Sequence, residues 1–254
     1  MDNLHLLFIN SNTVIDINDN VYPNPWMMLL MGPIFQQLGS ILLDPFIPDY
    51  LETPLETSRR FQWRTTFLAR IAAAVTGVAA VIVLHQSPNL QSDLMFGSSS
   101  LAVNLIIFSL GVHIGEIMDM VIHGQFSLFT IHHLAVIACF TGAILNNKAI
   151  GFAVLTLVTE LNAVTNKTRS LHVISNCDIT SLKYKINAYI NFVTFFIRIL
   201  VIFWMNDESI HFFVQEPSVF GGCCTLSLLF VNMWNLTVFK TLFVRDILQK
   251  PKDQ

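Results

Sequence analysis

Two adjacent histidines, His132 and His133, are the residues of this chain most suited to chemistry. They lie in the apolar stretch FSLFTIHHLAVIACF, which contains no lysine or arginine. Histidine is costly to place in hydrocarbon, so a pair there indicates a functional site. Imidazole takes up and releases a proton near neutral pH, and Glu116 or Glu160 is available to orient it. We therefore interpret His132 or His133 as a general base that activates a hydroxyl group for attack on a thioester.

Further polar residues fall at a similar depth in the neighbouring apolar segments. Four residues of one segment share an arc of about 120° on a helix with 100° per residue; they are His113, Glu116, Asp119 and His123. Other segments contribute Asn162, Asn191, Asn232 and an isolated Arg198. Because a lipid-facing position would be costly, we predict that these residues face a lipid cavity open to the cytosolic leaflet. The alternative is that each one hydrogen-bonds a neighbouring helix and has a structural role.

Metal binding is a less favoured use of the same side chains. Imidazole and carboxylate suit zinc or iron. However, no His-x-x-x-His or Glu-x-x-His pair occurs among these residues. We therefore predict no metal site and no bound cofactor, with acyl-CoA as the substrate that a histidine base would use.

The elements that must position these residues are membrane-spanning helices. The chain is 53% hydrophobic and 12% charged, whereas a soluble domain carries about 25% charged residues. Six segments have the roughly 20 mostly apolar residues that a bilayer core requires; they are 67–84, 101–122, 127–145, 149–164, 186–205 and 220–244. A seventh, 26–43, is interrupted by Pro33, Gln36 and Gln37, and it forms either a weak span or a re-entrant helix. The predicted fold is an all-α, polytopic transmembrane helix bundle.

One close helix contact can be predicted inside this bundle. Gly111 and Gly115 form a GxxxG pair, which permits the backbone of a neighbouring helix to approach. The segment 67–84 is rich in alanine, so we expect it to supply that neighbour.

Positive charge sets the orientation of the bundle. Alternate connections and the carboxyl tail hold eleven lysines and arginines, against only Lys148 in the opposite connections. Basic residues concentrate on the cytosolic side, so the carboxyl terminus is expected in the cytosol. The tail QKPKDQ places Lys250 and Lys252 at the spacing of a dilysine retrieval signal read by coat proteins, or else forms a basic membrane flank. The connections 84–98 and 206–219 would then face the lumen and could bind cargo. No basic patch with interleaved aromatic residues indicates nucleic-acid binding.

These features together resemble the TLC-domain family, which groups translocation-associated membrane proteins, ceramide synthases and ceroid-lipofuscinosis proteins. The resemblance is carried by FSLFTIHHLAVIACFTGAILNNKAIGFAVLTLVTELNAVTNKTRSLH, by Arg198 in the following span and by Trp234 in the last one. The closest likeness is to the branch of ceroid-lipofuscinosis neuronal protein 8. The resemblance to the family divides this chain into a tail with the weak first span (1–60), a six-helix TLC domain (61–246) and a cytosolic tail (247–254).

The resemblance implies a helical bundle of the endoplasmic reticulum that encloses a lipid-accessible cavity. Ceramide synthases of the family join a fatty acyl thioester to a long-chain base, and their signature continues with paired aspartates and a downstream lysine. This chain has Asn146, Asn147, Glu160 and Asn162 in the corresponding stretch, so ceramide synthase activity is not expected.

Two functions therefore stay open; phospholipid or sphingolipid homeostasis and lysosomal enzymes as cargo are what the resemblance implies for them. The first is a lipid acyltransferase acting in phospholipid or sphingolipid homeostasis, with His132, His133, Glu116 and Glu160 as the catalytic residues. The second is a non-enzymatic cargo receptor for lysosomal enzymes, or a lipid sensor, that cycles between endoplasmic reticulum and Golgi. Both make membrane lipids the expected partners, and the second adds coat proteins and luminal cargo.

Overall fold

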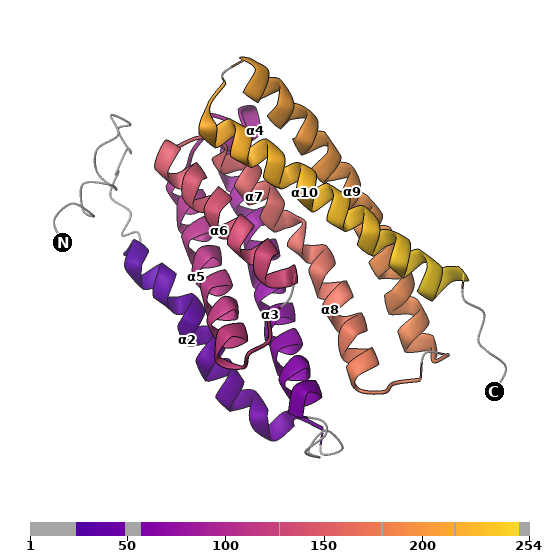
Figure 1. Ribbon diagram of the computed structural model, residues 1–254. Helices are drawn as coiled ribbons and strands as arrows, with labels where there is room; N and C mark the ends of the chain where they lie inside the picture. The colour runs from indigo at the N-terminus through magenta and orange to yellow at the C-terminus, as the bar shows by residue number, and fades with distance from the viewer. Residues whose placement is uncertain (1–23, 49–56, 127, 179, 216, 249–254) are drawn as a thin grey trace.

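A computed structural model of the chain describes residues 24–48, 57–126, 128–178, 180–215 and 217–248, which form a bundle of helices (Figure 1). The elements are α2 (Pro25–Leu43), η1 (Asp44–Phe46), α3 (Thr57–Gln86), α4 (Pro88–Ser92), α5 (Ser100–Ile122), α6 (Leu128–Asn146), α7 (Ile150–Val158), α8 (Glu160–Ile174), α9 (Leu182–Gln215), α10 (Val219–Leu242) and the π-helical η4 (Phe243–Leu248). Within the described residues, five helices are long and apolar enough to cross a membrane, namely α2, α3, α5, α9 and α10. The predicted all-α, polytopic bundle is confirmed.

Short polar residues begin several of these helices by capping their free backbone amides. The side chain of Asn24 accepts a hydrogen bond of 2.9 Å from the backbone N–H of Trp26, and Pro25 occupies the first helical position. Ser99 begins α5 and Ser218 begins α10 in the same way, through bonds of 3.2 Å and 3.0 Å. The local sequence therefore fixes where these apolar helices start.

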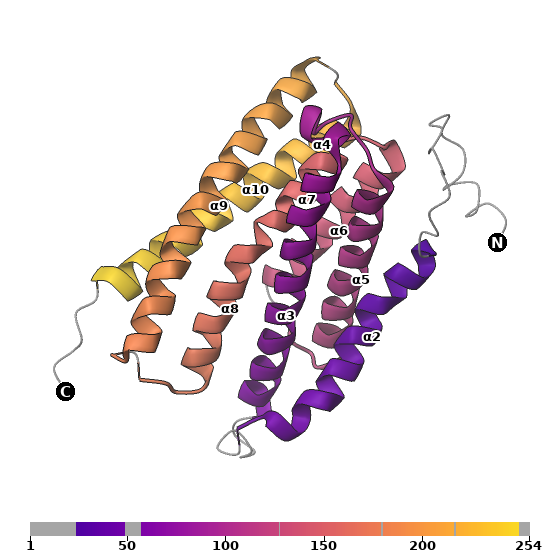
Figure 2. The same ribbon diagram turned by 180° about the vertical axis from the view of Figure 1, so that it is seen from behind.

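The two ends of the bundle differ in charge. At one end α3 and α9 begin and α5 and α8 finish, and we call it the basic end because it carries Arg59, Arg60, Lys183 and Lys185. It lies at the bottom of both views (Figure 2). The opposite end holds α4, the connection between α6 and α7, and the connection between α9 and α10. The charge difference between the two ends is thus the feature that indicates which side of the membrane each end faces.

The predicted span 149–164 is corrected by the structure, which divides it. α7 ends at Val158 and α8 begins at Glu160, with Thr159 between them. The hydroxyl of Thr156 donates to the carbonyl of Phe152 at 2.9 Å, and that of Thr159 donates to the carbonyl of Thr156 at 2.7 Å. Such side-chain bonds compete with the helical ladder and bend helices. The second piece continues to Ile174, well beyond the predicted end.

The predicted connection 206–219 is also corrected, because most of it is helical. α9 runs to Gln215 and α10 begins at Val219. Polar residues hold the extension in place: the hydroxyls of Ser209 and Thr225 lie 2.8 Å apart, and the amide of Asn206 donates to the carbonyl of Leu228 at 3.5 Å. Little loop is left between the two helices for contact with cargo.

Gly111 and Gly115 accommodate α2, so the expectation that segment 67–84 would pack there is wrong. A Cβ atom at Gly32 or at Gly111 would overlap the backbone of the other helix, and one at Gly115 would press on Pro33 and Gln36. Contact this close requires glycine on both sides. α2 therefore lies along α5 (Figure 1), and residues 25–46 are long and apolar enough to cross a membrane.

The buried core lies between α3, α5, α6 and α7. It contains Ala80, Leu90, Ile106, Ile150 and Val154, each without exposed surface. A smaller cluster joins α9 and α10 through Phe195, Ile199 and Leu242.

Candidate functional site

Three adjoining cavities run through the bundle toward its basic end. The apolar cavity is lined mainly by aliphatic and aromatic residues of α6, α7, α9 and α10, among them Val136, Phe140, Leu157, Ile202 and Val231. The polar cavity adds Asn166, Lys167 and Asn235. The mouth cavity lies at the basic end, is the largest at about 500 Å³, and is lined by Gln62, Gln125, Ser170 and Arg245.

Shared residues show how the three cavities connect. The apolar and polar cavities share His113, His132, Glu160 and Arg198. The polar and mouth cavities share Ala69, Glu116, His133 and Lys167. Six of the ionisable residues predicted from sequence thus stand at the two junctions, whereas Asp119 lines only the mouth cavity of the three.

A histidine–carboxylate cluster joins α5 to α6 at these junctions. Nδ1 of His133 lies 3.1 Å from Nδ1 of His113, and Nε2 of His133 lies 3.4 Å from Oε2 of Glu116. Nδ1 of His113 also lies 3.4 Å from the same carboxylate oxygen. The three side chains are only 12–14% exposed. Each ring nitrogen of His133 therefore has a polar neighbour within 3.4 Å.

His132 differs from its neighbour because its buried Nδ1 atom has no hydrogen-bond partner within the described chain. Its ring centre lies 5.6 Å from that of His133. Of the two histidines, His132 lines the apolar and polar cavities, whereas His133 lines the polar and mouth cavities. The two predicted catalytic histidines are thus both at the site, with the unpartnered nitrogen on His132.

Glu160 and Arg198 form an ion pair across the opposite wall of this junction. Nη2 of Arg198 lies 3.7 Å from Oε1 of Glu160, and the two side chains are 12% and 24% exposed. The pair joins the start of α8 to the middle of α9. Arg198 therefore has the carboxylate partner that an isolated arginine in an apolar span requires.

The remaining predicted cavity residues lie mainly in contacts between helices. The amide of Asn162 donates to Oδ1 of Asn191 at 3.3 Å and to the hydroxyl of Thr194 at 2.9 Å. The amide of Asn232 donates to the carbonyl of Ile202 at 3.4 Å. These asparagines are buried and follow the structural alternative. Asp119 lies near the mouth, where its Oδ1 is 3.8 Å from Arg64 and 3.3 Å from His123.

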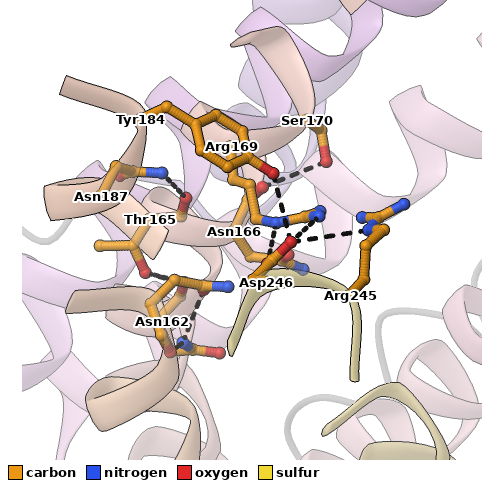
Figure 3. A network of polar contacts seen from close by, with 10 residues as sticks. Asn162, Thr165, Asn166, Arg169, Ser170, Tyr184, Asn187, Arg245 and Asp246 are labelled. Carbon is orange, nitrogen blue, oxygen red and sulfur yellow. Dashed lines mark hydrogen bonds and ion pairs between the residues drawn. The ribbon is translucent and has the colours of Figure 1, made fainter. Parts of the chain in front are cut away.

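A buried ion pair that no sequence pattern predicts ties η4 to α8 (Figure 3). Nε and Nη2 of Arg169 donate to the two carboxylate oxygens of Asp246 at 2.5 Å and 2.7 Å. The hydroxyl of Tyr184 donates to the same carboxylate at 3.2 Å. The partners are 77 residues apart, so no local pattern connects them. The predicted retrieval residues Lys250 and Lys252 lie outside the described residues.

Comparison with known proteins gives a family-level match. A family model described as TLC domain matches residues 62–244. TLC domain-containing protein 2 of Danio rerio is 32% identical over 207 residues, which are 78% of this chain and 83% of the relative. TLC domain-containing protein 2 of Mus musculus is 26% identical over 203 residues, covering 78% of this chain and 65% of the relative. TLC domain-containing protein 1 of Rattus norvegicus is 28% identical over 177 residues, or 68% and 70% of the two chains. No solved structure matches the chain significantly.

Proposed function

Since this chain belongs to the TLC-domain family of membrane proteins, we propose that it acts on membrane lipids by transferring an acyl group from acyl-CoA to a lipid hydroxyl. One observation carries the proposal: the imidazole of His132 lines both the apolar and the polar cavity, and its Nδ1 atom has no hydrogen-bond partner among the described residues. An acyl thioester has the same division, since its hydrocarbon chain is apolar and its carbonyl and head are polar. Its reactive carbon would lie at the junction when the chain fills the apolar cavity.

His132 acts in this scheme as the general base. It takes the proton of the acceptor hydroxyl while the oxygen attacks the thioester carbonyl carbon. The carbon–sulfur bond then breaks, and the leaving thiolate of coenzyme A takes the proton from His132, so the imidazole returns to its starting state. His133 and Glu116 hold the adjacent turn of α6 in place through their contact of 3.4 Å. Glu160 and Arg198 are positioning residues on the opposite wall.

The mouth cavity suits the polar end of such a donor. It is the largest of the three cavities, and Lys167 and Arg245 both line it. Cationic side chains favour the phosphate groups that coenzyme A carries. The charge asymmetry of the chain favours a cytosolic basic end, and acyl-CoA is made in the cytosol. The proposal therefore places the carboxyl terminus in the cytosol, and the endoplasmic-reticulum membrane is the location that the family resemblance implies.

A cargo receptor or lipid sensor is the less supported function. The connection between α9 and α10 is short, because α9 extends to Gln215. The retrieval residues Lys250 and Lys252 lie outside the described residues. A lipid sensor would use the same cavities without the chemistry, so it is the outcome that a negative activity test would leave.

The test is an acyl-transfer assay on the purified chain in lipid vesicles. Acyl-CoA is supplied with a panel of lysophospholipids and long-chain bases, and products are read by mass spectrometry. We expect an acylated product that falls by about 100-fold or more in His132→Ala, the size of contribution that a general base makes. His211→Ala is the matched control, because that histidine is 69% exposed and lies on α9 toward the opposite end. Absence of product from well-folded protein, or full activity in His132→Ala, would refute the proposal.

A further inference from the structure

The cluster of His113, Glu116 and His133 has a second possible use beyond hydrogen bonding. Each residue offers one ligand atom, and these atoms all lie within 4.8 Å of one another. Two of them belong to the same face of α5 at a spacing of three residues, and the third comes from α6. The signal in the sequence was thus a His-x-x-Glu pair, completed by a histidine 20 residues away.

With one ligand atom from each residue, two of the three separations within the cluster match those of a tetrahedral zinc site, and all three lie within 4.8 Å. Zinc bound at about 2.0–2.1 Å from each ligand holds its ligand atoms roughly 3.3 Å apart. The separations here are 3.1 Å between the two Nδ1 atoms and 3.4 Å from Oε2 of Glu116 to each histidine. His133 presents Nδ1 to one neighbour and Nε2 to the other. A rotation of its ring would bring one nitrogen within reach of both.

The cluster also has an entrance and an open side. Glu116 and His133 line the polar cavity and the mouth cavity, so an ion can arrive from the basic end without crossing the buried core. Three protein ligands leave a fourth position free for water or substrate, which is the arrangement of catalytic zinc sites built from two histidines and a glutamate. His132 lines the same polar cavity as the three ligand residues.

The surrounding charges are mixed. Asp119 lies one turn further along α5, is 2% exposed, and has an Oδ2 atom without a hydrogen-bond partner among the described side chains. The negative charge of this carboxylate favours a bound cation nearby. Lys167 lines the polar and mouth cavities, and its positive charge disfavours a bound cation there. The two histidines, when neutral, and the single carboxylate of Glu116 therefore suit one divalent cation.

We propose that His113, Glu116 and His133 bind one Zn²⁺ ion. Ion binding goes beyond the proposed function and does not depend on it. A catalytic use would rest on the proposed function: the ion would polarise the carbonyl oxygen of the bound thioester while His132 takes the proton. The competing account is a metal-free relay, in which His133 donates to Glu116 and His113 donates to His133.

The test is a Co²⁺ titration of the full chain, purified in detergent and stripped with a chelator. We expect one Co²⁺ per chain, visible absorption bands of the tetrahedral ion, and their loss on addition of Zn²⁺. Glu116→Gln and His133→Gln keep side-chain size and hydrogen-bonding groups but remove a ligand. Each should weaken Co²⁺ binding by more than the 10–100-fold that changes to outer-shell partners typically cost.

His123→Gln is the matched control, because this histidine lies at the end of the same helix outside the cluster. It should bind Co²⁺ as the wild type does. Zn²⁺ should also raise the thermal midpoint of the wild type and of His123→Gln, and not that of the two ligand variants. Wild-type protein that binds no Co²⁺, or ligand variants that keep wild-type affinity, would leave only the metal-free relay. Acyl transfer without ion binding would overturn this inference alone, whereas ion binding without acyl product would support it and refute the proposed function.

Discussion

Breaking the ion pair between Arg169 and Asp246 should loosen the carboxyl end of the bundle. The two side chains are 4% and 5% exposed, and two hydrogen bonds of 2.5 Å and 2.7 Å join them. Asp246→Ala leaves the guanidinium of Arg169 buried without its carboxylate and removes the acceptor of the Tyr184 hydroxyl (Figure 3). Removing one partner of a buried pair costs about 3–5 kcal/mol. A loss of this size increases the opening of η4 and α10 away from α8 by about 100-fold or more.

The assay is thermal unfolding of the purified chain in detergent, followed by circular dichroism. At roughly 2 °C per kcal/mol for a chain of this length, Asp246→Ala should lower the midpoint by at least about 6 °C. Arg245→Ala is the control, because that side chain is 48% exposed and lies 3.6 Å from the same carboxylate. It should cost no more than about 1 kcal/mol.

A double variant separates lost charge pairing from lost packing. Arg169→Met with Asp246→Leu replaces both charges by apolar groups, and it should recover most of the stability that Asp246→Ala loses. Equal midpoints for Asp246→Ala and Arg245→Ala would contradict a buried, stabilising ion pair. A double variant less stable than the single one would contradict it as well.

Three further predictions concern helix packing and the apolar cavity. Gly32→Val should detach α2 from α5, because a Cβ atom at position 32 overlaps the backbone of Gly111. Disulfide cross-linking between cysteines introduced into the two helices should then be lost. Cross-linking that persists in Gly32→Val would contradict the packing of α2 on α5. Asn191→Ala should cost only about 0.6 kcal/mol, the average for polar contacts between membrane helices, and a loss above about 2 kcal/mol in the melting assay would assign it more than a structural role. Cys139→Phe fills part of the apolar cavity, so it should shift the acyl-transfer products toward shorter acyl chains. Cys177→Phe, in the exposed α8–α9 connection, should leave the products unchanged. Equal product profiles in the two variants would show that the acyl chain binds elsewhere.

The sequence alone determined the class of the fold and the histidines worth attention. A long apolar segment predicts a membrane-spanning helix whichever helices pack against it, so most spans could be located from the sequence. His132 and His133 were conspicuous because imidazole in hydrocarbon is costly and needs a reason. The break at Thr159 was missed, since hydroxyls that bond to the backbone of their own helix leave the hydropathy pattern unchanged.

Only the tertiary structure decided which residues meet. The GxxxG pair of α5 indicates that another helix packs closely against it. It does not indicate that this helix is α2, because close packing depends on the surfaces of both helices. Asn162 and Asn191 were equally eligible for a cavity or a helix contact, and their mutual bond of 3.3 Å assigns them to the contact. The cluster that joins His113 and His133 and the pair of Arg169 with Asp246 arise from helices far apart in the chain. Periodicity records which face of one helix is polar, whereas the packing of all the helices together decides which polar faces touch.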